Sequence, residues 1–65
     1  MGVKYLCFVI EDIDGSTIFV PVESVSYFQR GGPEGWTEVG LKDGTKIETK
    51  KEPAEVMASR TTFEL

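Results

Sequence analysis

Two mostly hydrophobic stretches lie on either side of an Asp-Gly pair near the start of the chain. Residues 3–10 and 16–22 are rich in β-branched and aromatic side chains, and Asp14-Gly15 lies between them, which is typical of two antiparallel strands joined by a tight turn. A two-residue loop would set Glu11 opposite Ile18, whereas a three-residue loop places only apolar residues opposite one another. The alternation therefore favours the longer loop. It predicts the pairs Ile10–Ile18, Phe8–Val20 and Leu6–Val22.

A second pair of strands is predicted at 36–41 and 45–50, around Asp43-Gly44. The same loop length pairs Val39 with Ile47 and Leu41 with Thr45 on one face. The opposite face carries charges of both signs, which are expected to form a ladder of ion pairs. These charged residues are Glu38, Lys46, Glu48 and Lys50.

Residues 23–30 lie between the two pairs and should form a further strand, or continue the second strand after a bend. Val25 and Tyr27 share one face of this strand in the alternation. Pro21 has no amide donor and therefore marks an edge, a bulge or a strand break. Residues 31–35 contain three glycines and no apolar residue besides a proline, which indicates a loop.

Helix signals appear in residues 52–60. Pro53 occupies a first-turn position, Glu55 lies in the first turn and Arg60 in the last. Val56 and Met57 are expected to dock this helix on the sheet, together with Phe63 beyond its end. The expected fold class is α+β: one domain, residues 1–65, with a small antiparallel sheet of four to five strands, two Asp-Gly hairpins and one short C-terminal helix.

The amino-acid composition excludes several kinds of catalytic and metal-binding site. The chain of 65 residues contains no histidine and one cysteine, which excludes an internal disulfide, zinc sites of the usual kind and imidazole-based catalysis. Cys7 alternates with apolar neighbours and fits a small buried residue better than a nucleophile. Asp12 and Asp14 offer oxygen ligands for calcium or magnesium, but an acidic residue before glycine is what a tight turn requires. We expect a protein that is not an enzyme and has no cofactor or metal.

The net charge of the chain disfavours some classes of binding partner. Eleven acidic and seven basic residues give a net charge of −4, which opposes attraction to nucleic acid and to anionic membranes. The sequence has no apolar run long enough to span a bilayer and no signal-peptide pattern, so a cytoplasmic location is expected. One cluster of basic residues is the exception to this acidic balance. It fits either part of the predicted ion-pair ladder or a basic stripe that binds single-stranded nucleic acid. It consists of Lys42, Lys46, Lys50 and Lys51.

The first strand pair is apolar on both faces, and one short helix covers only one of them. Tyr5 and Phe19 lie on the second face, for which another copy of the chain or a partner protein is the natural cover. Trp36 follows the glycine-rich loop and fits two interpretations: an anchor of a protein interface, as large aromatic side chains often are, or a cover for the stem of Lys50 across the strand pair. The candidate partner-binding residues are therefore Trp36, Pro33, Glu34, Tyr5 and Phe19.

The segment from Gly15 to Met57 resembles FlbD-type proteins, short bacterial proteins associated with flagella and swarming. The matching residues are Asp14-Gly15, Val22-Glu23-Ser24-Val25-Ser26-Tyr27, Thr37-Glu38-Val39-Gly40-Leu41-Lys42-Asp43-Gly44, Ile47, Glu52 and Glu55-Val56. The Gly31–Gly35 loop, Trp36 and the Glu52-Pro53 helix start depart from that pattern. The central strand and turn are also similar to the β-rich core of LytTR-type DNA-binding domains, which are longer and more basic. Neither resemblance implies a catalytic residue.

Together these features predict a non-enzymatic protein-binding or regulatory module that acts as a homodimer or within an assembly. The alternatives are a small nucleic-acid-binding transcriptional regulator and a phage-type inhibitor of a host protein. Salt-dependent binding of DNA or RNA would distinguish the first alternative.

Overall fold

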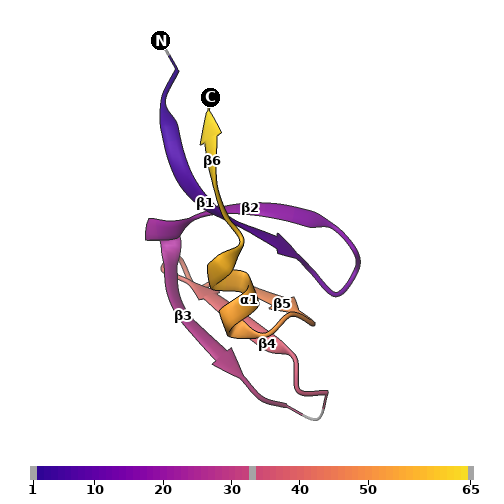
Figure 1. Ribbon diagram of the computed structural model, residues 1–65. Coiled ribbons are helices and arrows are strands. Elements are labelled where there is room, and N and C mark those ends of the chain that lie inside the picture. The colour runs from indigo at the N-terminus through magenta and orange to yellow at the C-terminus, as the bar shows by residue number, and fades with distance from the viewer. Residues whose placement is uncertain (1, 33, 65) are drawn as a thin grey trace.

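Six strands in the described part of the chain form two antiparallel sheets of three strands each, with one short helix (Figure 1). The computed structural model describes residues 2–32 and 34–64. The fold is mostly β, and the two sheets correct the expectation of a single sheet of four to five strands. In chain order the elements are β1 (Lys4–Glu11), β2 (Thr17–Pro21), the 3₁₀ turn η1 (Val22–Ser24), β3 (Val25–Arg30), β4 (Thr37–Leu41), β5 (Lys46–Thr49), α1 (Pro53–Ala58) and β6 (Arg60–Glu64).

The first sheet has the strand order β2-β1-β6. Ile10 lies opposite Ile18 and Phe8 opposite Val20, as the alternation favours. The expected pair Leu6–Val22 does not form, because β2 ends at Pro21 and Val22 begins η1. This turn directs the chain out of the first sheet and into the second.

The second sheet has the strand order β3-β4-β5, with Val39 opposite Ile47. The register between β3 and β4 shifts between Val25 and Tyr27, which adds one residue to β3 as in a β-bulge. As a result Val25 and Phe28 both pack on the core, whereas Tyr27 is exposed. Tyr27 and Val25 therefore do not share a face as the simple alternation predicted.

The predicted charge ladder on the outer face of this sheet does not form. Glu38 lies directly opposite Glu48, so like charges meet across β4 and β5, and Lys46 lies opposite Gly40. Within residues 2–32 and 34–64 the ion pair is instead between Arg30 and Glu52. The predicted register of β4 and β5 is thus correct, but it does not bring residues of opposite charge together.

The hydrophobic core fills the space between the two sheets. Phe8 from the first sheet meets Phe28 from the second edge to face, with ring centroids 5.5 Å apart, a favoured aromatic geometry. The buried members of the cluster come from both sheets and the helix: Phe8, Ile10, Val20, Val39, Ile47 and Val56.

The helix is shorter than predicted. It begins at Pro53 and ends at Ala58, so Arg60 belongs to β6 and not to the last helical turn. Val56 is buried in the core as expected, but Met57 is exposed and does not dock the helix. The strand β6, which was not predicted, follows immediately and pairs with β1.

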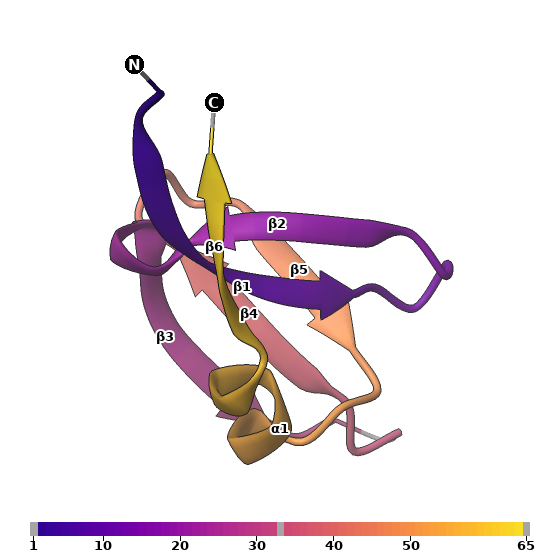
Figure 2. The ribbon, with the colours of Figure 1, turned by 45° about the horizontal axis from the view of Figure 1, so that its top comes forward.

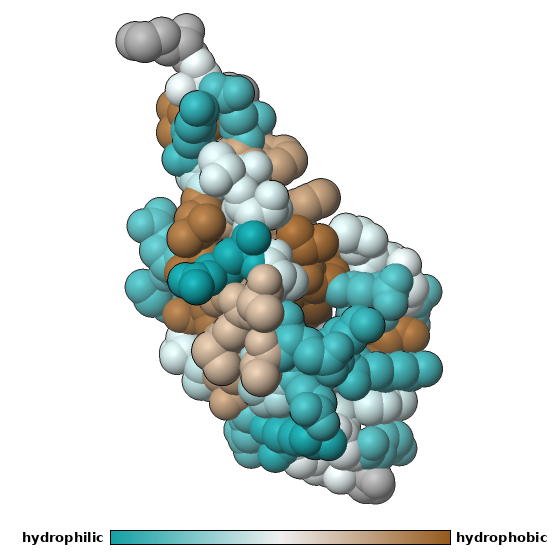
Figure 3. Space-filling model, viewed as in Figure 1, coloured by the Kyte–Doolittle hydropathy of each residue, from teal (hydrophilic) through white to brown (hydrophobic). Residues whose placement is uncertain are grey.

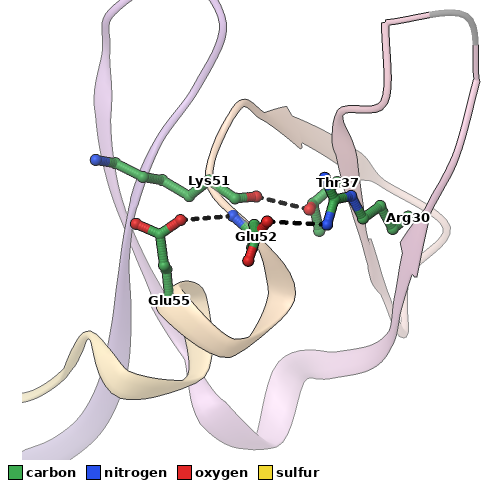
Figure 4. Close-up of polar contacts among 5 residues, drawn as sticks. All are labelled: Arg30, Thr37, Lys51, Glu52 and Glu55. Carbon is green, nitrogen blue, oxygen red and sulfur yellow. Dashed lines mark hydrogen bonds and ion pairs between the residues drawn. The ribbon is translucent and has the colours of Figure 1, made fainter.

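Hydrogen bonds tie the start of α1 to the second sheet (Figure 4). The buried Thr37 hydroxyl donates to the Lys51 carbonyl at 2.6 Å. The Glu52 N–H donates to the Glu55 carboxylate at 3.1 Å, and Arg30 Nη1 lies 3.0 Å from Glu52 Oε1. These contacts fix the direction in which the helix leaves β5.

The beginning of β1 and the end of β6 extend away from the rest of the molecule, as Figures 1 and 2 show. The molecule is accordingly elongated, with principal extents of 46 × 21 × 20 Å. Leu6 lies on this projecting ribbon and is 48% exposed. In the described part of the chain, no helix has the length and apolar character needed to cross a membrane.

Candidate protein-binding face

The outer face of the first sheet, turned away from the core, carries a group of aromatic and small side chains. Strand pairing defines this group, because successive residues of a strand point to opposite faces and directly paired residues share one. We call it the aromatic face. Its members are Tyr5, Cys7, Val9, Glu11, Thr17, Phe19, Pro21, Thr61 and Phe63.

Phe19 and Phe63 form the centre of the aromatic face. They come from β2 and β6, the two strands that flank β1, yet their ring centroids are only 5.4 Å apart. The rings therefore meet across β1, over Cys7, which is 2% exposed. Phe19 itself remains 48% exposed and Phe63 38% exposed. The pair seals the thiol and still presents aromatic surface to solvent.

The aromatic face is nearly free of charge. Among its members only Glu11, at the end of β1, is ionisable at neutral pH, although 28% of the chain is charged. Charged residues of the same strands, such as Lys4, Arg60 and Glu64, lie on the opposite face. Hydrophobic atoms reach the surface around the region where β1, β2 and β6 meet (Figure 3). Such a face is suited to contact with another apolar surface.

The helix does not cover the aromatic face. Its buried residue, Val56, packs with Phe8 and Val39 in the core between the sheets, on the other side of β1. Tyr5 and Val9 are half-buried by their neighbours on the sheet. The exposed Phe19 and Phe63 rings thus have no second layer above them among the described residues.

The structure brings two of the predicted partner-binding residues together and separates the rest. Tyr5 and Phe19 share the aromatic face. Trp36 is half-buried next to β4 and borders a shallow hollow with Gln29 and Glu48 on the second sheet. Glu34 is exposed in the loop before it, and Pro33 lies outside the described residues. Trp36 and the aromatic face therefore belong to different sheets.

Phe63 is the member of the aromatic face that sequence reasoning placed elsewhere. It was expected to dock the helix, but it lies in β6, directly opposite Tyr5. The β-branched pair Thr61-Thr62 before it is a strand signal. The strand was not predicted because these residues directly follow the predicted helix.

Aspartate side chains in the two turns stabilise those turns by accepting hydrogen bonds from backbone N–H groups. Asp12 Oδ1 accepts hydrogen bonds from the backbone N–H groups of Asp14 at 3.0 Å and Ser16 at 2.9 Å. Asp43 Oδ1 accepts one from the Thr45 N–H at 2.8 Å, and this bond lowers the pKa of the Asp43 carboxyl. Within residues 2–32 and 34–64 no three acidic or cysteine side chains are grouped as metal ligands would be.

Comparison with known proteins adds no relative to this description: no protein-family model, no curated protein sequence and no solved structure matches the chain.

Proposed function

We propose that this protein is a non-enzymatic protein-binding module that associates with a second copy of itself through the aromatic face. The single observation that supports this most strongly is the exposed Phe19–Phe63 pair on a sheet face whose only charged member is Glu11. A chain with a net charge of −4 repels its own copies, and a nearly uncharged face is where that repulsion is least. A face on one side of a sheet also suits a two-fold dimer, in which the same patch is used twice.

The size of the exposed rings sets how much they contribute to the contact. Their exposed parts amount to roughly 170 Å² per copy, taking about 200 Å² for a whole phenylalanine. A standard interface buries about 800 Å² per partner, so the dimer must also cover Tyr5, Val9 and the other members of the aromatic face. Burying the rings of two copies contributes about 8 kcal/mol at 25 cal/mol per Å², which association costs of about 4–15 kcal/mol largely offset. The rings alone therefore do not hold a stable dimer, and its affinity depends on the further surface that the contact covers.

Sedimentation velocity over a range of protein concentrations tests this proposal. The intact protein should shift from monomer to dimer with concentration, and Phe63→Ser should shift the transition to at least tenfold higher concentration. Leu6→Ser is the matched control: Leu6 is as exposed as Phe19 but lies on the opposite face of the same sheet. A monomer at all concentrations, or equal effects of the two substitutions, would refute the proposal.

A partner of another kind remains the alternative. A phage-type inhibitor would use the same face on a host protein. A DNA- or RNA-binding role would have to use Lys42, Lys46, Lys50 and Lys51. Titration with DNA and with RNA at two salt concentrations separates that role, because phosphate contacts weaken steeply as salt rises.

A further inference from the structure

A groove of about 730 Å³ separates the edge of the first sheet from the edge of the second. One side is β2, residues 18–21, and the other is formed by the end of β4, the β4–β5 turn and Ile47. β2 and β5 are the edge strands of their sheets, and they are not paired with each other. The groove therefore runs between the edge of β2 and the start of β5, and Lys46 of β5 borders the adjoining hollow.

The β2 side of the groove offers backbone hydrogen-bonding groups. The Asp12 N–H donates to the Ser16 carbonyl at 2.9 Å, so hydrogen-bonded pairs recur at every second position from there, at Ile10–Ile18 and Phe8–Val20. Phe19 lies between these positions, and its N–H and C=O point away from β1. Among the described residues neither group has a hydrogen-bond partner.

The β5 side is arranged in the same way. The Leu41 N–H donates to the Thr45 carbonyl at 2.8 Å, so Thr45 and Ile47 direct their backbone groups toward β4. Lys46 and Glu48 direct theirs away from β4, and the Glu48 carbonyl indeed accepts a hydrogen bond from the Ile13 N–H at 3.1 Å. The Lys46 N–H and C=O point the same way and have no partner in the part of the chain that the structure describes.

Two hydrogen bonds close the ends of the groove and set its length. At one end Ile13 is bonded to Glu48, and at the other the Lys42 N–H donates to the Ser24 carbonyl at 2.9 Å. Between them the extended wall is β2, residues 18–21. At about 3.3 Å per extended residue this is room for a segment of about four residues. Ile18, Val20, Leu41 and Ile47 give the groove an apolar floor.

Charges around the groove are mainly acidic. Glu23, Lys42 and Asp43 border it. The adjoining hollow, which shares Ile18 and Ile47 with the groove, adds Asp12, Asp14, Glu38, Lys46 and Glu48. Six carboxylates thus face two lysines, and a segment with basic ends is attracted more than an acidic one.

We propose that this groove binds an extended segment of a partner protein by strand addition, with alternate apolar side chains on the floor and basic residues at its ends. The segment hydrogen-bonds to Phe19 of β2 on one side and to Lys46 of β5 on the other, which joins the two sheets through an added strand. This site is distinct from the aromatic face, because it uses strand edges and not the outer face of a sheet.

A peptide titration followed by amide NMR tests the proposal. The probe is a seven-residue peptide that alternates valine with threonine and carries a lysine at each end. It should shift the amide resonances of residues 18–20 and 45–47 and slow hydrogen exchange of the Phe19 and Lys46 amides. The same peptide with glutamate at its ends should bind at least threefold more weakly.

Two substitutions at one position isolate the backbone contact. Lys46→Pro and Lys46→Ala both remove the lysine side chain, but only proline also removes the N–H, and proline is tolerated at an edge position that donates no internal hydrogen bond. Lys46→Pro should weaken peptide binding about three- to tenfold relative to Lys46→Ala. If Lys46→Pro does not fold, protection of the Phe19 amide in the intact protein decides alone.

Three results would overturn the proposal: no binding of the lysine-ended peptide at millimolar concentration, resonance shifts confined to β1 and β6, or protection of the Phe19 and Lys46 amides before any peptide is added. The last would mean that a second copy fills the groove. Phe63 lies outside the groove, so Phe63→Ser should weaken self-association at least tenfold and leave peptide affinity unchanged. Failure of strand addition and failure of self-association are thereby distinguishable.

Discussion

The ring of Tyr27 lies directly on Gly40, its partner across β3 and β4, so closely that a Cβ atom at position 40 would overlap the ring. The Tyr27 hydroxyl donates a hydrogen bond to Glu38 Oε2 at 2.5 Å. The bulge in β3 turns Tyr27 outward, and the glycine provides the space for its ring. Glycine in a strand weakens the strand by itself, and the aromatic ring compensates by covering the exposed backbone.

Gly40→Ala should destabilise the protein by about 1–2 kcal/mol, because the new methyl group displaces the Tyr27 ring. In a Tyr27→Ala background the same change should be neutral or stabilising, since alanine loses less backbone conformational entropy on folding than glycine does. Urea unfolding of the four proteins gives this double-mutant cycle. An equal effect of Gly40→Ala in both backgrounds would show that the ring and the glycine are not coupled.

The hydrogen bond to Glu38 raises the pKa of Tyr27 above its usual value of 10.0, because the carboxylate accepts a bond from the neutral phenol and repels the phenolate. The folded protein therefore holds this proton more tightly than the unfolded chain. The resulting stability is fully present below pH 10 and is lost as the pH rises through the raised pKa.

This shift can be measured by ultraviolet titration of the tyrosines. Glu38→Gln should return the pKa of Tyr27 toward its usual value, since the amide accepts a hydrogen bond without a charge. Tyr27→Phe should lower stability at neutral pH, with the difference from the intact protein shrinking at alkaline pH. A pH-independent difference would contradict the assignment.

Val56→Ala should cost about 2 kcal/mol, because Val56 is the buried contact of α1 with the core and its loss leaves a cavity. Met57→Ala, at the next position of the same helix, should change stability by less than about 0.5 kcal/mol because Met57 is exposed. Urea unfolding measures both. A larger effect of Met57→Ala would mean that the helix docks through the other side.

Thr37→Val should cost about 1 kcal/mol, since the valine keeps the shape of the side chain but removes the donor to the Lys51 carbonyl. Thr62→Val, on the exposed strand β6, provides the control and should be nearly neutral. A neutral Thr37→Val would indicate that water replaces the hydroxyl without cost.

The alternation of residues along the strands correctly predicted most of the residue pairs between β1 and β2 and between β4 and β5. The pairs Phe8–Val20 and Val39–Ile47 follow from the rule that paired residues share a face, and that rule needs no knowledge of the rest of the molecule. The division into two sheets depends on the break after Pro21, which the residue type permits but does not require. The bulge that turns Tyr27 outward is an extra residue that alternation cannot register.

The candidate face was only partly visible in the sequence. Tyr5 and Phe19 could be placed together because they lie on predicted neighbouring strands. Phe63 could not, because β6 pairs with β1 across the whole length of the chain, and a single sequence carries no signal for such a distant pairing. The groove between β2 and β5 arises from the packing of the two sheets and was likewise beyond reach.

The most direct test of the account is an isotope-filtered NMR experiment on a mixture of ¹³C-labelled and unlabelled protein at a concentration where the dimer forms. We predict contacts between copies from the rings of Phe19 and Phe63 to Tyr5 and Val9 of the other copy. Absence of any contact between copies, or contacts that arise only from residues outside the aromatic face, would contradict it.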